Sequence, residues 1–366
     1  MTNETNQPSF AIRVISYGPQ EIVEARLASV AEIPEHLGKQ PITWVDIEGR
    51  ADDEFVNEVG KLFELHPLAL EDVVHANQRA KVEKYGKHHF IVTRMVALKE
   101  RLESEQLSIF FGKDFVVTFQ DRPGGDCLDP VRERIRKDYG VIRRESADHL
   151  AYAILDAVVD SYFPVLDAIG EQLNTLQDEI SSKVDRQIPN RIHTLKQQVW
   201  HLRKAIWPMR DALNSLIRDG GAGMSSETLL HLRDTQDHAI RIMDFVEGYR
   251  ELCADLTNLH MSRESQRVNA LMRILAIVST IIMPGTLITG IYGMNFHSDK
   301  SPFNMPELNW YYGYPFALLL IVMVMGGLTF WLWWTGWLTG NSHRTWRGWK
   351  HVLGFIRFRR SKNAHN

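Results

Sequence analysis

A stripe of amide, thioether, hydroxyl and small side chains recurs every three or four residues near residue 280, and its chemistry suits an ion pathway. The stripe consists of Asn269, Met272, Leu275 or Ala276, Ser279, Met283, Thr286 and Gly290. At helical spacing these side chains share one face. Small and hydroxyl residues also serve simply to pack transmembrane helices together. The stripe alone therefore leaves pore lining and helix packing open.

An ion handled by such a face would keep its water shell. No Asp, Glu, Lys or Arg occurs from Ile274 to Ser298, which disfavours a proton relay or a carboxylate site for a bare ion within the membrane. Mg²⁺ holds its octahedral water shell tightly and is usually bound through it. A ring of Asn295 amides at the outer mouth would accept hydrogen bonds from those waters. Thr286, Met283 and Leu275 would form a narrow apolar passage below that ring.

Two long apolar runs must position these residues. Residues 271–292 and 314–338 are each long enough to cross a bilayer core of about 30 Å, so we expect two transmembrane helices. Aromatic residues cluster at both ends of the second run, at 310–314 and 331–337, as they do at membrane interfaces. Seven basic residues and no acidic residue follow Leu308. The positive-inside rule then places both termini in the cytoplasm, with 293–313 as an outer loop and 339–366 as a basic cytoplasmic tail.

The remainder is expected to be cytoplasmic and to begin with an α/β domain at residues 1–144. Five segments rich in β-branched and aromatic residues predict strands: Phe10–Ser16, Ile42–Glu48, His88–Val96, Leu107–Phe111 and Phe115–Phe119. Residues 51–74 carry helical spacing, with a new helix start at Pro67.

Strand patterns are absent after about Ala147, and helices are expected from there on. Residues 145–222 predict an antiparallel helical hairpin, with Pro164 as a kink in its first helix. Residues 223–292 predict one stalk helix about 100 Å long that continues into the first membrane span. A helix of that length cannot bury its faces within one monomer, which indicates assembly with copies of itself.

The end of the first span reads "YGMNF", and "MPEL" follows at 305–308. With these motifs in this position, the chain resembles the CorA family of metal-ion transporters, whose signature is a Gly-Met-Asn triplet. The segments "HPLALEDVV", "LESEQLSIFF", "DPVRERIR" and "LRKAIWPMRDAL" extend the resemblance over nearly the whole chain from about residue 40. The resemblance implies a funnel-shaped homopentamer: an α+β (αβα) cytoplasmic domain, a long helical stalk and two C-terminal transmembrane helices.

The resemblance also implies roles for individual residues. The outer mouth and selectivity site would be formed by Gly293, Met294, Asn295 and Glu307. The pore lining would be Asn269, Met272, Leu275, Met283 and Thr286, with the two methionines and the leucine as a hydrophobic gate. Carboxylates that bind regulatory Mg²⁺ between neighbouring cytoplasmic domains would be Glu71, Asp72, Asp156 and Asp234.

The function implied is passive uptake of Mg²⁺, and also of Co²⁺ and Ni²⁺, through the cell (inner) membrane, driven by the membrane potential and gated by cytosolic Mg²⁺. The expected partners are copies of the chain, the lipid bilayer and divalent cations, with no nucleic acid and no organic cofactor. No GxxxxGK[ST], GxSxG or HExxH motif occurs, so we do not expect an enzyme.

Two departures from the family pattern keep alternatives open. The outer loop contains the longer segment "HSDKSPFN" with His297 and Lys300, and Asn258 stands where close relatives carry an acidic stalk residue. Imidazole suits zinc, so a Zn²⁺ transporter of the ZntB type is an alternative. A membrane-anchored oligomeric scaffold or sensor is another.

Overall fold

The computed structural model describes residues 10–49, 52–75, 78–122, 126–182, 185, 187–219, 224–294 and 303–338. The chain divides into an N-terminal unit, Met1–His260, and a C-terminal unit, Met261–Asn366. Helix α7 (Ser226–Tyr292) contributes residues to both units. The sheet therefore belongs to the N-terminal unit, and the apolar end of α7 belongs to the C-terminal unit.

Seven strands form one mixed sheet in the N-terminal unit, in the order β2-β1-β3-β7-β6-β5-β4. The strands are β1 (Phe10–Tyr17), β2 (Ile22–Leu27), β3 (Ile42–Gly49), β4 (Lys81–Tyr85), β5 (His88–Leu98), β6 (Leu102–Phe111) and β7 (Phe115–Gln120). Neighbouring strands are antiparallel except β3 and β7, which run parallel. Alternation along each strand sends Trp44 to one apolar layer and Val45 to the other.

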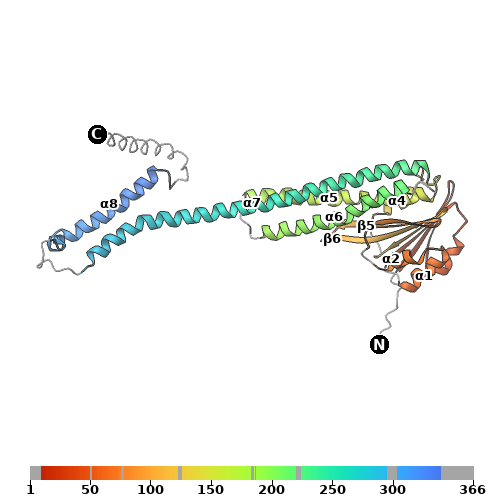
Figure 1. The fold of residues 1–366 in the computed structure, drawn as a ribbon, viewed down its shortest axis with the longest axis horizontal. Coiled ribbons are helices and arrows are strands. Elements are labelled where there is room, and N and C mark those ends of the chain that lie inside the picture. The colour runs from red at the N-terminus through yellow and green to blue at the C-terminus, as the bar shows by residue number, and fades with distance from the viewer. Residues whose placement is uncertain are drawn as a thin grey trace, which may run out of the picture. The chain divides into compact units, whose positions relative to one another are not determined.

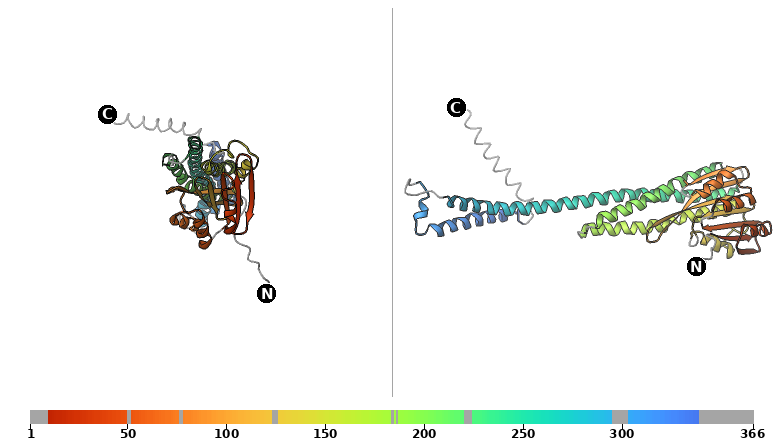
Figure 2. Two further views of the ribbon diagram at one scale, coloured as in Figure 1. Left: turned by 90° about the vertical axis from the view of Figure 1, so that its right-hand side faces the viewer. Right: turned by 90° about the horizontal axis from the view of Figure 1, so that it is seen from below.

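Helices cover both faces of this sheet (Figures 1 and 2). One layer contains η1 (Val30–Glu35), α1 (Asp53–Leu62) and α2 (Pro67–Val74). The opposite layer contains α3 (Asp129–Arg136), α4 (Ala147–Asp160), α5 (Tyr162–Ser182), α6 (Ile188–Asp219) and the N-terminal part of α7. This three-layer arrangement confirms the predicted αβα unit.

All five predicted strands are present, and the two that were not predicted are the edge strands β2 and β4. Their sequences are IVEARL and KVEKY, and neither strand contains a fully buried residue. Charged side chains on an edge strand also discourage pairing with another chain. Sequence patterns identify a strand by the apolar residues of its buried face, and these two strands bury few side chains.

The first helix of the predicted hairpin differs from expectation, because it is interrupted at Ser161 instead of being kinked at Pro164. The Ser161 hydroxyl donates to the Val158 carbonyl oxygen at 2.6 Å, which ends α4. Tyr162 is fully buried, and its hydroxyl donates to the Arg94 carbonyl oxygen at 2.9 Å. Pro164 consequently lies in the first turn of α5, where its missing N–H removes no helical hydrogen bond.

The described part of the C-terminal unit consists of the end of α7, a short helix η3 (Pro306–Asn309) and α8 (Gly313–Trp334). Helices α7 and α8 are each long and apolar enough to cross a membrane. Helix α8 runs beside the last turns of α7 (Figure 2). Their contact lies at Gly285, where an added Cβ would be 3.1 Å from Met325 Sδ. Glycine at this position lets the two helices approach closely.

Candidate metal-ion sites

The predicted pore stripe on α7 lies on the side that α8 leaves open. Helix α8 covers the Gly285 side, where Ile281 and Ile288 are partly buried. At 3.6 residues per turn, Met283 and Thr286 point well away from Gly285. Stripe residues remain exposed in the single chain: Asn269, Met272 (61%), Leu275 (61%), Met283 (72%) and Thr286. Nearly all of residues 261–283 are exposed in the single chain, so the relevant feature is that Met283 and Thr286 lie away from the contact at Gly285, as lining a shared axis would need.

The polar groups of this stripe can meet a hydrated cation without giving up helical hydrogen bonds. The Thr286 hydroxyl donates to the Met283 carbonyl oxygen at 2.8 Å. Its lone pairs stay available to accept hydrogen bonds from metal-bound water. About three to four helical turns toward the N-terminus from Thr286, Met272 and Leu275 offer only apolar surface, which resists the passage of hydrated ions.

The predicted outer mouth is described in part. Gly293, Tyr292 and Thr289 at the end of α7 line a cavity of about 390 Å³ together with Glu307 of η3. Met294 is about half exposed. Asn295, like His297 and Lys300, lies outside the described residues.

Backbone packing fixes the position of the Glu307 segment. A Cβ on Gly313 would lie 2.1 Å from the Glu307 carbonyl oxygen, so only glycine fits at the start of α8. The Trp310 N–H also donates to that oxygen at 3.1 Å. Glu307 is thereby held beside the end of α7, where a carboxylate would attract cations.

Of the four predicted regulatory carboxylates, Glu71 and Asp72 lie on α2, which begins at Pro67. Asp72 is paired with Lys81 of β4, whose Nζ lies 2.6 Å from the Asp72 Oδ2. Glu71 is exposed. A metal ion binding Asp72 would have to displace or share this partner.

Asp156 and Asp234 lie elsewhere, on the facing sides of α4 and α7. The Thr235 hydroxyl donates to Asp156 Oδ1 at 2.8 Å. His238 links the two helices, with Nδ1 at 3.3 Å from Asp160 Oδ1 and Nε2 at 4.0 Å from Asp234 Oδ2. Ligand atoms of Asp156, Asp160 and His238 all lie within 4.8 Å of one another.

This cluster has the chemistry of a divalent-cation site. Burial raises the pKa of Asp156, and the neighbouring negative charge of Asp160 raises it further. A bound divalent cation would relieve both effects by favouring the ionised carboxylate. Carboxylate oxygens suit Mg²⁺, whereas a set that includes imidazole also accepts Co²⁺, Ni²⁺ or Zn²⁺.

The four predicted carboxylates do not form one site within a single chain. Helix α2 packs on one face of the sheet through Ala69, Leu70 and Val73. Helix α4 packs on the other face through Leu150 and Ile154. Joining the two pairs would therefore require a second copy of the chain.

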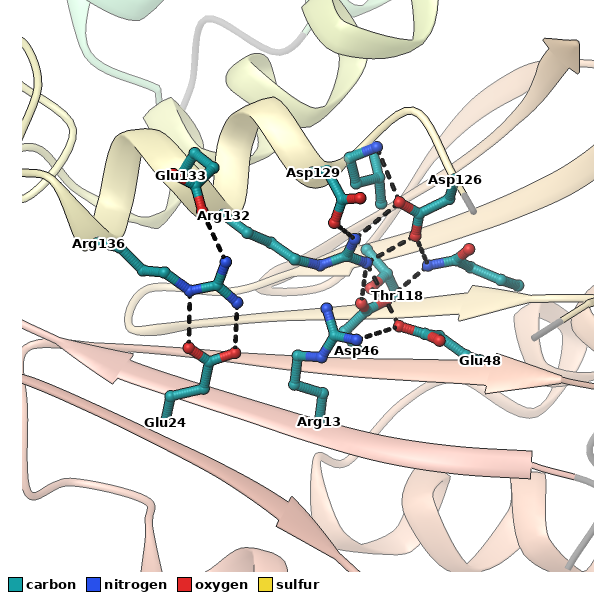
Figure 3. A network of polar contacts seen from close by, with 12 residues as sticks. Arg13, Glu24, Asp46, Glu48, Thr118, Asp126, Asp129, Arg132, Glu133 and Arg136 are labelled. Carbon is teal, nitrogen blue, oxygen red and sulfur yellow. Dashed lines mark hydrogen bonds and ion pairs between the residues drawn. The ribbon is translucent and has the colours of Figure 1, made fainter. Parts of the chain in front are cut away.

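A second acidic group, Asp46, Glu48 and Asp126, is occupied by arginine instead of being open to a metal (Figure 3). Arg132 ion-pairs with Asp46 and lies 2.6 Å from Asp126 Oδ2, and Arg13 lies 2.9 Å from Glu48 Oε1. Burial alone would raise the pKa of Asp126, but the hydrogen bond and charge of Arg132 bring it below its usual range. These groups join β3 to α3 and serve stability.

Asp160 and His238 were not predicted from the sequence. Each lies four residues after a predicted carboxylate, Asp156 and Asp234 respectively, so each shares a helix face with its neighbour. This four-residue spacing is visible in the sequence and could have indicated both residues as further candidate ligands. The contact between the two faces, however, depends on how α4 packs against α7.

The fold and these sites together define a class: a protein with an αβα unit that carries a candidate metal-ion site, and with two apolar C-terminal helices. Residues 39–335 match the family model described as CorA-like Mg²⁺ transporter protein. The chain belongs to this family, which is a family of ion transporters and not of enzymes.

Individual comparisons agree with the family. The chain is 39% identical over 318 residues to the cobalt/magnesium transport protein CorA of Thermotoga maritima, covering 86% of this chain and 89% of that one. The complete structure of the CorA magnesium transporter from Methanocaldococcus jannaschii has the same fold, with a TM-score of 0.76 at 21% identity over 89% of this chain and 98% of that one. The ZntB cytoplasmic domain from Vibrio parahaemolyticus shares the fold of the N-terminal unit at 14% identity and a TM-score of 0.57, over 70% of this chain and 99% of that one. This fold alone therefore does not identify the transported ion.

Proposed function

We propose that the protein is a passive transporter for divalent cations, chiefly Mg²⁺ and also Co²⁺ and Ni²⁺, that works as a homopentamer in the cell (inner) membrane. The name of the Thermotoga maritima relative, a cobalt/magnesium transport protein, supports Mg²⁺ and Co²⁺. Both termini lie in the cytoplasm, and Asn295 with Gly293, Met294 and Glu307 forms the outer mouth.

The observation that carries the proposal is the exposed stripe of α7 on the side away from α8. In a ring of copies, Thr286 faces the axis near the outer end. Met283, Leu275 and Met272 form the apolar gate, and Asn269 lies at its inner end. With α8 outside α7, lipid contacts the bulky apolar residues of both helices.

No energy source beyond the membrane potential is needed. A divalent cation entering a cell gains about 4.6 kcal/mol per 100 mV, since each charge gains about 2.3 kcal/mol. Uptake is therefore downhill until the internal concentration is high, and the transporter requires a gate more than it requires a pump.

Cytosolic Mg²⁺ acts on this gate through the carboxylates. Glu71 and Asp72 of one copy meet Asp156 and Asp234 of the next, because the two pairs lie on opposite faces of the sheet in one chain. These carboxylates repel one another unless a divalent ion bridges them. Bound Mg²⁺ then favours the closed arrangement of the copies. When Mg²⁺ dissociates, this arrangement is no longer favoured and the gate opens.

The test is uptake of Mg²⁺, Co²⁺ and Zn²⁺, side by side, into proteoliposomes held at a fixed potential. Thr286→Val and Asn295→Ala should each lower Mg²⁺ flux while the assembly stays intact. Thr329→Val is the matched control. The Thr329 hydroxyl also donates to a helical carbonyl oxygen, but Thr329 lies on α8.

Other results would contradict the proposal in distinguishable ways. Zn²⁺ flux exceeding Mg²⁺ flux would favour the ZntB-type transporter. Absence of any flux from a correctly assembled protein would favour the scaffold or sensor. Equal flux in Thr286→Val and the control would remove the stripe from the pathway.

A further inference from the structure

A cavity of about 770 Å³ lies in the N-terminal unit between helix α6 and the β4–β6 edge of the sheet. Its volume falls within the range of small-molecule sites, about 300–1,000 Å³. None of the metal-ion residues above lines it. The transport proposal thus gives this cavity no role.

Cations surround the cavity, and its lining contains no carboxylate. Arg79, Arg94, Arg203 and Lys204 line it together with His201. Such a concentration of like charge is unfavourable unless an anion is bound nearby.

The carboxylates that pair with Arg79 and Arg203 are each shared with a second arginine. Asp211 lies 3.6 Å from Arg79, but it is also 2.7 Å from Arg210. In the same way, Glu247 is shared between Arg203 and Arg250. The Arg79 pair is largely exposed, so it contributes little and can be exchanged for a ligand.

Two tryptophans at the cavity add a flat aromatic surface. Trp200 is 55% exposed and Trp207 is 38% exposed. Lys204 Nζ lies 5.6 Å from the centroid of the Trp200 ring. The Trp207 ring already carries two guanidinium groups, those of Arg203 and Arg210, at 5.1 and 5.2 Å from its centroid, which leaves Trp200 as the freer surface. An exposed indole beside a cation is a platform on which nucleobases stack.

A buried hydroxyl provides the second polar feature. Ser104 Oγ is shielded from solvent and has no hydrogen-bond partner among the described residues. It belongs to the lining of the cavity. Since buried polar groups usually find partners, this hydroxyl is suited to a ligand or to ligand-associated water.

We propose that this cavity binds a nucleotide, with its base stacked on Trp200 and its phosphates held by Lys204 and the surrounding arginines. Inorganic phosphate alone would not fill the cavity, and it has no aromatic ring that could stack on the exposed indoles. Because Mg²⁺ neutralises two phosphate charges, the metal-free nucleotide binds more tightly than its Mg²⁺ complex. The site would therefore respond to the ratio of free to Mg²⁺-bound nucleotide.

The test is calorimetric titration of the assembled full-length protein in detergent with ATP in the presence of EDTA. ATP should bind at least about tenfold more tightly than adenosine or pyrophosphate, because each supplies only one half of the contacts. Saturating Mg²⁺ should weaken ATP binding by about tenfold. Neither measurement depends on ion transport, so failure here leaves the transport proposal standing.

Two variants and a matched control complete the test. Trp200→Leu and Lys204→Gln should each weaken ATP binding by about tenfold. Lys196→Gln changes the same charge on an exposed position of α6 outside the cavity and should leave binding unchanged. No ATP binding at millimolar concentration, or equal binding in Trp200→Leu, would overturn the proposal. Pyrophosphate binding as tightly as ATP would reduce the site to one for anions and would equally overturn it.

Discussion

The imidazole Nδ1 of His238 lies 3.3 Å from the Asp160 carboxylate, which joins α7 to α4 beside Asp156. Three potential ligands thus come from two helices, one of which continues into the membrane-type segment. A metal ion held between these helices would bias the position of α7 relative to α4, which is what a gate sensitive to cytosolic metal requires.

The first prediction concerns the nitrogen ligand of this cluster. His238→Ala should reduce the rise in melting temperature given by Co²⁺ far more than the rise given by Mg²⁺, because Mg²⁺ prefers oxygen ligands. The expected loss of Co²⁺ affinity is about tenfold, measured from melting curves at several metal concentrations. His193→Ala, an exposed position on α6, is the control. Equal losses for both ions would show that His238 does not ligate.

The second prediction concerns His149, which is buried against Tyr152 and His231. Burial and the nearby His231 and Arg134 charges lower the pKa of His149 to about 4, despite the opposing charge of Asp148. Because its folded pKa is below its unfolded value, its contribution to stability is present above pH 6.5 and is lost as pH falls toward 4.

The measurement for His149 is the free energy of unfolding of the N-terminal unit from pH 7 to pH 4. His149→Leu should flatten the acid limb by up to about 1.4 kcal/mol per pH unit. His193→Leu should keep the slope of the unchanged protein. A His149→Leu variant with an unaltered slope would mean that this imidazole titrates normally.

The long helices could be predicted from the sequence because their signal is local. Helix α6 lies within residues 145–222, where a helical hairpin was expected, and α7 begins three residues after the predicted start at 223 and ends at the predicted residue 292. The charged edge strand β4 was not predicted, because its place in the sheet depends on its pairing with β5, which the local sequence does not show. His238 was not predicted as a metal ligand for a related reason: a histidine becomes a candidate ligand only when another helix brings carboxylates close to it.

The third prediction concerns the buried charge network of Figure 3. Arg132→Met should lower the free energy of unfolding by about 3–5 kcal/mol, because Asp46 and Asp126 would remain buried without their cation. Lys137→Met, on the exposed side next to α3, should cost about 1 kcal/mol or less. Urea unfolding of the two variants gives the comparison.

A companion variant separates charge from packing at Arg132. Replacing Asp46 and Asp126 by Asn together with Arg132→Met should recover much of the lost stability, since no buried charge is then unpaired. If the triple variant is less stable than Arg132→Met, the network contributes mainly through hydrogen-bond geometry, as in the Thr118 hydroxyl that donates to Asp46 Oδ1 at 2.7 Å.

The last prediction tests whether the Glu307 segment must stay beside the end of α7. Gly313→Ala places a Cβ 2.1 Å from the Glu307 carbonyl oxygen, so this backbone must move. Mg²⁺ uptake into proteoliposomes should fall by about tenfold, since relieving such overpacking costs about 1–3 kcal/mol and displaces the mouth. Gly326→Ala is the matched control, because an added Cβ there meets no atom within 4 Å. If both variants transport Mg²⁺ normally, the position of Glu307 does not matter for entry, and cation capture must depend on other groups of the outer loop.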